Sequence, residues 1–495
     1  MKFFVTLTLL LTILCISASC SVKETQQTND STILSTAETS ISEETKLETE
    51  PLPIVDYGGD EFVILVNDRS DDYRSVEFAA EEMDGSLLND AVYDRNLKIE
   101  TLYNVDIVNH KASDEPSVLR KSVLANETTF DIALIPITYC GALALDRLLA
   151  DYNEFPYLNL EAEHWDRNAL KRFSLNKKLY IALGDMNIND KDMTWCLFFN
   201  KNLAVNYNLP DIYSLVNDKK WTFDIFSELC QNVSNDLNGD GIYDDNDLWG
   251  HVTVFARSTI AYMYSMGAEY IKKDSADLPV LNFGDQRIYE AYDKVHALFF
   301  TGNTCHDVET MPFSGYAHQW RKCEAMFGAE QILFYGEAMQ NAERFRSFET
   351  DFGILPLPSY EEGVYGNNML WHQSYATVIP LTTISSDEKL TRAGLLLEAI
   401  QAESHSTVLE AYYEKALKSK FSRDEKSADM IDIIFKNRYI DIATYYGWGK
   451  ASDKLMAAGK NGDENIVSLF ASIESATQAD IDITVRNWRK INDNS

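Results

Sequence analysis

Residues 130–135 read FDIALI, an apolar run interrupted by one aspartate. Pro136 follows, and because proline cannot donate a hydrogen bond to a sheet, we expect a buried strand that ends there. Further apolar runs and segments with helical spacing precede this strand, at 62–66 (FVILV), 87–103, 105–108 and 117–125. Strands that alternate with helices predict βαβ units and a mostly parallel sheet, which is an α/β fold.

This pattern places the residues after the FDIALI strand at a ligand-binding edge. Open α/β sheets bind ligands outside the carboxyl ends of their strands, so we expect residues 138–140, with Tyr139 among them, on such a loop. Two more strands are predicted at 179–183 and 194–200. The polar stretch 184–191 lies between them, and we expect it to be the first crossing between two lobes.

The second half of the chain again mixes strands and helices, and it ends in a helical tail. The ~440 residues beyond the N-terminal region are too many for one compact core, so two lobes are expected. We predict helices at 223–233, 287–300, 336–345 and 387–403, strands at 248–255, 331–334, 351–358 and 375–379, and further helices from 407 to 492.

The N-terminus has the features of an export signal that ends at Cys20. A positive charge comes first, residues 3–16 are almost wholly apolar, and small residues precede the cysteine. This arrangement resembles a bacterial lipobox, so residues 1–20 are expected to be a lipoprotein signal peptide with Cys20 as the lipidated terminus. Ser17 departs from the aliphatic residue usual at its position. Cleavage near Ala18, which leaves Cys20 free, is the alternative.

Composition changes after Cys20 and limits the class of partner. Residues 21–55 are rich in Ser, Thr and Glu and contain no aromatic residue, which predicts a disordered linker. The net charge is −33, from 77 acidic and 44 basic residues, and this argues against nucleic acid and against a basic membrane-docking patch. We therefore expect a body held to the extracellular face of the cell membrane by its lipid anchor.

An ordered series of segments resembles the extracellular solute-binding proteins of bacterial ABC importers, family 1, the maltose-binding type. These segments are 89–100 (NDAVYDRNLKIE), 130–135, 197–201 (LFFNK), 220–229 (KWTFDIFSEL), 236–250, 325–336 (AMFGAEQILFYG), 351–358, 375–380 (YATVIP) and 417–433. They cover most of residues 60–450, and their order along the chain carries the likeness.

The resemblance implies a type II periplasmic-binding-protein fold, in which hinge strands join two α/β lobes around a ligand cleft. Lobe one would comprise 56–184 with 360–403, and lobe two 195–356 with 404–495. The resemblance also implies a monomer that is not an enzyme and that delivers a carbohydrate, in particular an oligosaccharide, to the permease subunits of an ABC importer. A surface glycan-binding or sensory protein with the same clamp is the alternative.

Residues 236–247 (DLNGDGIYDDND) have the donor spacing of a calcium loop, with Gly241 at the sharp turn. The expected Ca²⁺ ligands are the side chains of Asp236, Asn238, Asp240, Asp244 and Asp247 and the carbonyl of Ile242. Asp247 stands where a longer glutamate is usual, so we expect weak binding with a structural role. A solvated turn without metal is the alternative.

Aromatic residues on predicted loops at strand ends are the ligand candidates. Sugar C–H faces stack on aromatic rings while hydroxyl groups need polar partners, so a glycan site mixes both kinds of side chain. The candidates are Tyr139, Phe255, Arg257, Tyr335, Trp371, His372, Tyr445 and Trp448. Trp371 and Trp448 are expected to be stacking platforms for a neutral glycan, whereas Trp195 and Trp221 are expected in the core. Packing in the core or at the surface is the alternative for each candidate.

Motifs of the common enzyme classes are missing from the sequence. There is no nucleotide-binding, serine-hydrolase or zinc-protease motif, which argues against an enzyme. The five cysteines after Cys20 include no CxxC pair, so we expect them to be buried and reduced, although Cys305 and Cys323 are able to pair.

Overall fold

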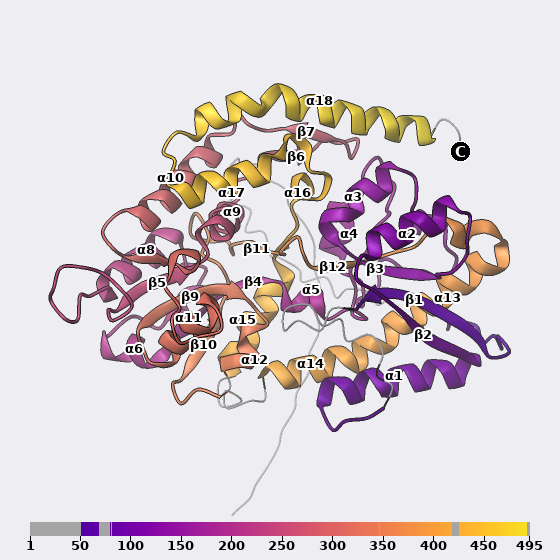
Figure 1. The fold of residues 1–495 in the computed structure, drawn as a ribbon, viewed down its shortest axis with the longest axis horizontal. Coiled ribbons are helices and arrows are strands. Elements are labelled where there is room, and N and C mark those ends of the chain that lie inside the picture. Colours follow the sequence, from indigo (N-terminus) through magenta and orange to yellow (C-terminus); the bar gives the residue numbers. More distant parts are fainter. Residues whose placement is uncertain (1–50, 69–79, 81, 346, 418–424, 493–495) are drawn as a thin grey trace, which may run out of the picture. The chain divides into compact units, whose positions relative to one another are not determined.

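The computed structural model describes residues 51–68, 80, 82–345, 347–417 and 425–492. The chain divides into two units, Met1–Pro51 and Leu52–Ser495, and the fold described here belongs to the second. Within that unit, helices pack on two main sheets, which we call the first sheet and the second sheet (Figure 1).

The first sheet is built mainly from the N-terminal part of the unit. Its order is β12-β3-β1-β2, formed by β1 (Asp60–Asn67), β2 (Val105–Ala112), β3 (Ile132–Pro136) and β12 (Tyr375–Val378). β1 runs parallel to β2 and β3, and β12 runs antiparallel to β3, so that Tyr375 lies opposite Pro136. Three helices pack against this sheet: α1 (Leu87–Tyr103), α2 (Glu115–Leu124) and α3 (Ile137–Leu145).

The second sheet comes from the middle of the chain. Its order is β10-β4-β9-β5-β8, formed by β4 (Trp195–Asn200), β5 (Trp249–Thr253), β8 (Cys305–Asp307), β9 (Ile332–Ala338) and β10 (Phe352–Leu355). β5 is parallel to β8 and β9, whereas β4 is antiparallel to β9 and β10. β10 is one of the two edge strands, and it ends before Pro356, which cannot donate a hydrogen bond to a sheet.

Helices of the middle segment surround the second sheet. They are α6 (Lys201–Asn206), α7 (Ile212–Asn217), α8 (Phe223–Val233), α9 (Phe255–Ser265), α10 (Gln286–Phe300), α11 (Gln319–Gly328) and α12 (Asn341–Phe345). The Thr222 hydroxyl accepts a hydrogen bond from the Ile225 amide and so caps α8, as the sequence indicates. Smaller elements complete the core: α4 (Arg167–Phe173), α5 (Asn189–Asp192), the antiparallel pair β6 (Ile271–Lys273) and β7 (Pro279–Leu281), and β11 (Asn368–Met369).

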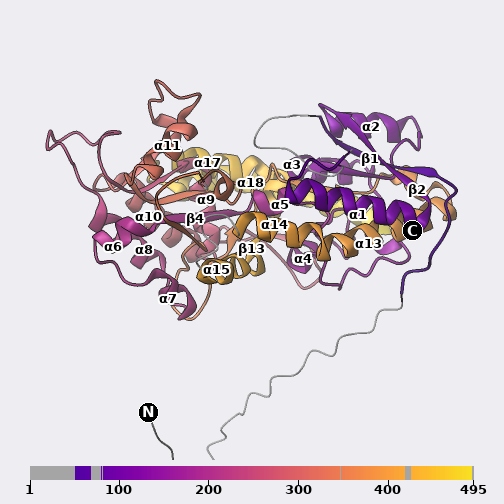
Figure 2. The same cartoon turned by 90° about the horizontal axis from the view of Figure 1, so that it is seen from below.

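The C-terminal third contacts both sheet regions. It comprises α13 (Asp387–Ser406), α14 (Val408–Leu417), α15 (Glu425–Lys436), β13 (Arg438–Tyr439), α16 (Ile442–Tyr446), α17 (Ala451–Asn461) and α18 (Ile466–Asn492). α14 packs against α1, beside α13, and α15 packs against β10 (Figure 2). α17 packs against α9, where a Cβ on Gly459 would lie 2.0 Å from the Thr259 hydroxyl oxygen, so the approach requires glycine. The lobe boundaries that we expected stay a prediction.

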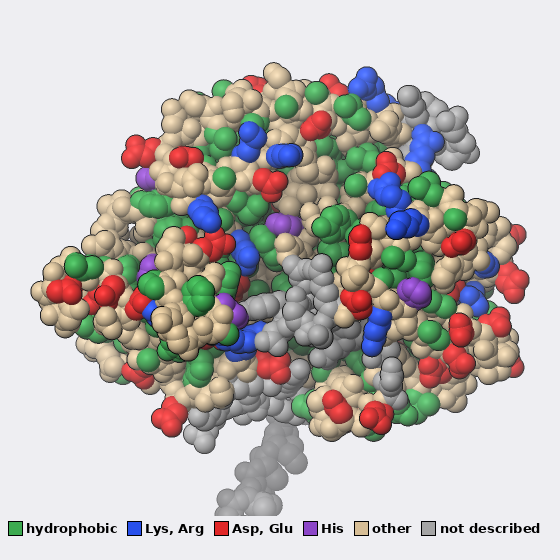
Figure 3. Space-filling view, viewed as in Figure 1, with side chains coloured by type: hydrophobic (Ala, Val, Ile, Leu, Met, Phe, Trp, Pro, Cys, Tyr) green, Lys and Arg blue, Asp and Glu red, His purple; other side chains and the backbone are tan. Residues whose placement is uncertain are grey.

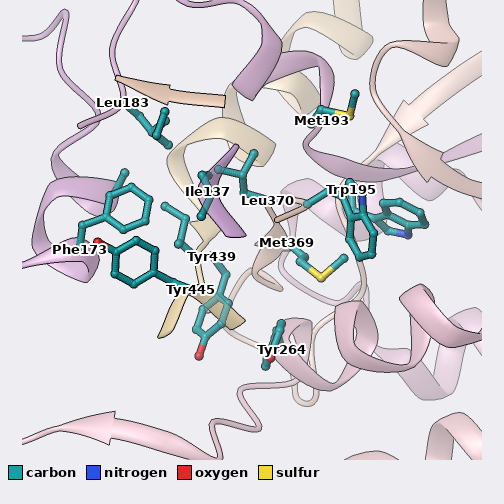
Figure 4. Close-up of a cluster of buried hydrophobic side chains, with 14 of the residues drawn as sticks. Ile137, Phe173, Leu183, Met193, Trp195, Tyr264, Met369, Leu370, Tyr439 and Tyr445 are labelled. Atoms are coloured by element: carbon teal, nitrogen blue, oxygen red, sulfur yellow. The ribbon is translucent and has the colours of Figure 1, made fainter. Parts of the chain in front are cut away.

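One buried cluster joins the side chains of the two sheet regions (Figure 4). Leu370 and Met369 lie between Ile137, which follows β3, and Trp195, which begins β4. Tyr439 on β13 stacks on Tyr264 of α9, with ring centroids 4.5 Å apart. Because this cluster is continuous, the segments that cross between the sheets are packed from both sides.

Most of the predicted elements are confirmed, and three predictions are wrong. Residues 138–140 lie in α3 and not on a loop, because Pro136 ends β3 and the apolar stretch after it begins a helix at once. Residues 179–183 form no strand; their only pairing is an isolated bridge from Ala182 to Thr377. Residues 336–338 continue β9, and the helix predicted from Gly336 begins only at Asn341.

Candidate functional site

A cavity of about 400 Å³ lies at one edge of the second sheet, and we call it the aromatic pocket. Its lining residues are Met193, Trp195, Arg257, His318, Trp320, Glu337, Ala338, Gln340, Trp371 and Gln373. This volume is within the range of small-molecule sites, and a cavity with aromatic walls and a few polar groups is typical of them.

The strand directions of the second sheet explain why these residues meet. β5 and β9 are parallel, so their carboxyl ends lie at the same edge of the sheet. Glu337 and Ala338 end β9, and Arg257 is the third residue of α9, which begins directly after β5. β4 runs the opposite way, so that Trp195 at its start pairs with Ala338. The pocket is therefore at the carboxyl edge, where open α/β sheets bind their ligands.

The segment 371–374 brings the first sheet to the same place. The Thr138 amide donates to the His372 carbonyl over 3.1 Å, and the Ile137 amide donates to the Ser374 carbonyl over 2.8 Å. Both donors directly follow β3, whose carboxyl end thus holds the segment. On the other side, the Trp371 amide donates to the Met193 carbonyl over 3.0 Å. The segment is fixed between the carboxyl edges of both sheets.

Two indole rings face the Arg257 guanidinium, and a third indole ring contacts one of them. The guanidinium carbon lies 4.8 Å from the centroid of the Trp371 ring and 5.8 Å from that of Trp320. Trp195 contacts Trp371 at a centroid distance of 6.3 Å. A cation over indole faces is attracted by the ring quadrupole, so these rings fix the position of Arg257.

Glu337 is the buried acid of the aromatic pocket, with only 4% of its surface exposed. One carboxylate oxygen accepts from Trp320 Nε1 over 3.1 Å, and the other accepts from the Ala338 amide over 3.0 Å. Burial raises the pKa of Glu337, although the charge of Arg257 and these two hydrogen bonds oppose the shift. Burial also lowers the pKa of His372 to about 4, and Arg257 lowers it further, so this imidazole is neutral at pH 7.

The candidates predicted from sequence separate into those at cavities and those elsewhere. Arg257 and Trp371 line the aromatic pocket. His372 and Tyr445 line a smaller neighbouring cavity of about 160 Å³. Tyr139 is 52% exposed on the first turn of α3 and lines none of the cavities described here.

Three of the predicted candidates are packed in the core. Phe255 begins α9 and stacks on Phe299, with centroids 4.2 Å apart. Tyr335 lies in the middle of β9 and not on a loop, because that strand is longer than predicted, and its side chain is fully buried. Trp448 is buried, and its indole Nε1 donates to the Thr484 hydroxyl over 2.8 Å.

Sequence reasoning missed five of the polar or aromatic residues that line the pocket: Trp320, Glu337, His318, Gln340 and Gln373. Glu337 could have been found from the sequence. If the strand predicted at 331–334 is extended to Ala338, Glu337 lies at its carboxyl end, where ligand-binding residues are expected. Trp320 had none, since it begins a helix that only tertiary packing brings beside β9. Trp195 is in the core as predicted, but its ring also forms part of the pocket wall.

The calcium-loop residues are held by hydrogen bonds within the loop. Asp236 accepts from the amides of Gly239 and Gly241, and Asp240 accepts from the amide of Ile242. Asp247 is fully buried and accepts from the amides of Leu237 and Asp244. The donor set consists of the oxygen ligands that Ca²⁺ prefers. As they lie, however, no three or more His, Cys, Asp or Glu side chains among the described residues form a group that could hold a metal ion. Calcium binding stays a prediction.

Two further expectations concern the N-terminus and the cysteines. Cys20 and residues 1–50 lie outside the described residues. In the part of the chain that the structure describes, no helix has the length and apolar character needed to cross a membrane. Cys305 and Cys323 are both buried and free, as are Cys140, Cys196 and Cys230.

Comparisons with solved structures relate this architecture to known proteins. No protein-family model matches the chain, and no curated protein matches it. RafE from Streptococcus pneumoniae is similar with a TM-score of 0.53 and 11% identity, over 86% of this chain and 98% of that one. A cyclo/maltodextrin-binding protein in complex with maltotetraose has a TM-score of 0.52 and 13% identity, over 87% and 97%.

A third similar structure is an ABC substrate-binding protein from Listeria monocytogenes in complex with cycloalternan. Its TM-score is 0.50 at 11% identity, and the match covers 87% of this chain and 99% of that one. At such low identity the likeness establishes the fold. Two of these three structures thus hold an oligosaccharide, maltotetraose in one and cycloalternan in the other. The chain has the two-lobed α/β fold of the maltose-binding-type solute-binding proteins.

Proposed function

We propose that this protein is an extracellular solute-binding protein that captures an oligosaccharide and delivers it to the permease of an ABC importer. The aromatic pocket carries the proposal. It combines the faces of Trp195, Trp320 and Trp371 with the charged groups of Arg257 and Glu337. Indole faces suit the C–H patches of a sugar ring, and the charged groups suit its hydroxyls.

The fold supports the same proposal. Ligand binding between two sheet regions gives the protein a way to report occupancy, because closure around a ligand adds contacts that the open form lacks. A permease that distinguishes the two forms then receives only the loaded protein.

A thermal-shift panel of mono- and oligosaccharides tests the carbohydrate part of the proposal. A ligand at 100 times its Kd adds about 2.7 kcal/mol of apparent stability, so a true ligand raises the Tm clearly. If no carbohydrate raises the Tm and amino acids or peptides do, the proposal is wrong. Deletion of the gene should also abolish uptake of the identified sugar; intact uptake would favour the sensory alternative.

The lipid anchor is a separate part of the proposal, and it rests on Cys20 in the sequence. Cys20→Ala should move the protein from the membrane fraction to the soluble extracellular fraction. Unchanged membrane association of this variant would exclude the anchor, while the carbohydrate proposal would stand.

A further inference from the structure

The aromatic pocket contains hydrogen-bond donors that have no acceptor. Within the described residues, Arg257 makes no hydrogen bond and no ion pair; its recorded contacts are the two indole faces. The Nε1–H of Trp195 is buried and has no hydrogen-bond partner in the described structure. Guanidinium and indole nitrogens only donate, so the pocket has a surplus of donors.

Arg257 is half-buried, and two other arginines of this protein, the buried Arg438 and the half-buried Arg392, are committed to internal acceptors. Arg438 donates to Asp190 over 2.6 Å and also to Asp166. Arg392 donates to Asp131 over 2.7 Å. Because an unmatched buried donor costs roughly 1–3 kcal/mol, such pairing is the usual arrangement. Arg257 departs from it at a cavity wall, which indicates an acceptor supplied from outside the chain.

Compensation of the Glu337 charge is the simplest alternative role for Arg257. The two groups interact electrostatically, since Arg257 opposes the burial effect on the pKa of Glu337. They do not form an ion pair, however, and the carboxylate oxygens accept from Trp320 Nε1 and the Ala338 amide. Compensation therefore leaves the N–H groups of Arg257 available to a ligand.

We propose that the ligand is an acidic oligosaccharide, whose carboxylate binds Arg257 and whose hydroxyls donate to Glu337. This inference rests on the proposed function and replaces the neutral glycan expected from sequence. The planar guanidinium matches a carboxylate in two parallel hydrogen bonds, which a neutral hydroxyl cannot form.

The remaining pocket residues explain why the ligand is a sugar acid and not a simple anion. Glu337 would repel an anion that brings no donor, whereas a sugar acid brings hydroxyl groups to it. The indole faces need an apolar patch, which a sugar ring has and an inorganic anion lacks. Exposed charges farther from the ligand than the Debye length of about 8 Å are largely screened, so the nearby Arg257 outweighs the distant part of the net charge of −33.

Titration calorimetry of the full chain with matched pairs of ligands tests this inference. Each pair consists of an acidic trimer and the methyl ester of the same trimer. The acids are the trimers of galacturonate and of mannuronate, and a xylose trimer that bears glucuronate. We expect at least one acid to bind roughly tenfold to a hundredfold more tightly than its ester, as charge-assisted hydrogen bonds imply. Added salt should weaken binding of the acid and leave the ester unchanged.

The variants Arg257→Gln and Arg287→Gln form a matched comparison. Arg287 also lies over an aromatic ring, 3.5 Å from the centroid of Tyr360, but it does not line the pocket. Arg257→Gln should bind the acid only as tightly as the ester, while Arg287→Gln keeps the preference. If Arg257→Gln does not fold, Arg257→Lys replaces it in the test, because lysine keeps the charge but lacks the planar fork. The comparison of acid and ester in the wild type then completes the test.

Two results would overturn the inference, and they are distinguishable. If neutral sugars or esters bind as tightly as the acids, or if Arg257→Gln keeps the preference, binding of an acidic ligand through Arg257 is wrong and the carbohydrate function stands. If neither acids, esters nor neutral sugars bind, the proposed function itself is wrong.

Discussion

The segments 371–373 and 445–448 both carry aromatic residues beside the junction of the two sheets, but they use these residues differently. Trp371 contributes one wall of the aromatic pocket and lies beside the Arg257 guanidinium. Trp448 stacks on Tyr446, with centroids 4.7 Å apart and an angle of 6° between the rings, and its Nε1 bonds Thr484. A polar group with an internal partner, as at Trp448, indicates packing, whereas a donor without one at a cavity wall, such as Arg257 beside Trp371, indicates ligand contact.

The surface supports the same distinction on a larger scale. On the face drawn in Figure 3, acidic and basic side chains are scattered, and no basic side chains gather into a patch among the residues coloured there. On this face, positive charge for an anionic ligand therefore comes from individual residues and not from a basic patch. Substitution of pocket residues should change the affinity for the ligand, and substitution of residues with internal partners should change the free energy of unfolding.

The largest expected effect is on stability, at Trp448. Trp448→Ala should lower the free energy of unfolding by ~3–5 kcal/mol, because it leaves a large cavity and removes the hydrogen bond to Thr484. Chemical denaturation measures this loss. Trp448→Phe, which keeps a ring, should lose only about 1 kcal/mol through the hydrogen bond. Weaker ligand binding at unchanged stability would instead place Trp448 at the ligand.

Next in size is the effect on affinity at the pocket rings. Trp371→Ala and Trp320→Ala should each weaken carbohydrate binding by ~1–3 kcal/mol, the scale for an aromatic anchor. Trp371 is only 8% exposed, so its variant should also lose stability, whereas the less buried Trp320 should mainly lose affinity. Calorimetry and denaturation on the same samples separate the two effects. Wild-type affinity in both variants would mean that the ligand binds elsewhere.

Local sequence patterns predicted the sheets well, but they predicted only two of the ten residues that line the pocket as ligand candidates. Strands β1 and β3 are buried apolar runs, so composition alone identifies them, and the strand-end rule found Arg257 and Trp371. It failed at Tyr335, where β9 continues beyond the predicted end. It also failed at Trp320, because the position of α11 beside β9 depends on contacts between segments that are distant in sequence. Whether the indole N–H of a tryptophan finds a hydrogen-bond acceptor, as that of Trp448 does, likewise depends on tertiary contacts.

A smaller stability effect is expected at the predicted calcium loop, none of whose residues lines the aromatic pocket. Calcium at ten times its Kd should add about 1.4 kcal/mol to the apparent stability of chelator-treated protein. Asp240→Ala should make the Tm insensitive to calcium and to chelator, and neither change should alter carbohydrate affinity. Identical melting curves with and without calcium, together with no metal in elemental analysis, would exclude the site.

The smallest expected effect concerns His405, whose imidazole has an internal partner. Its Nδ1 lies 2.6 Å from the Asp185 carboxylate, which also lies 3.1 Å from Lys191 Nζ. The hydrogen bond to Asp185 raises the pKa of His405, and partial burial opposes this. Because the folded-state pKa is the higher one, the stabilisation is complete below the unfolded value of about 6.5 and is lost as pH rises through the folded value.

We therefore expect the free energy of unfolding of the wild type to fall relative to that of His405→Gln as the pH rises from about 6 to about 8. The expected difference is at most about 1 kcal/mol. The effect is small because the His405 side chain is 42% exposed and solvent screens the pair. Urea denaturation of both proteins across this pH range measures the difference. Carbohydrate affinity should be the same in both, since His405 does not line the aromatic pocket. Parallel pH profiles of the two proteins would show that the ion pair adds nothing to stability. A loss of carbohydrate affinity in His405→Gln would contradict the separation of pocket residues from residues with internal partners.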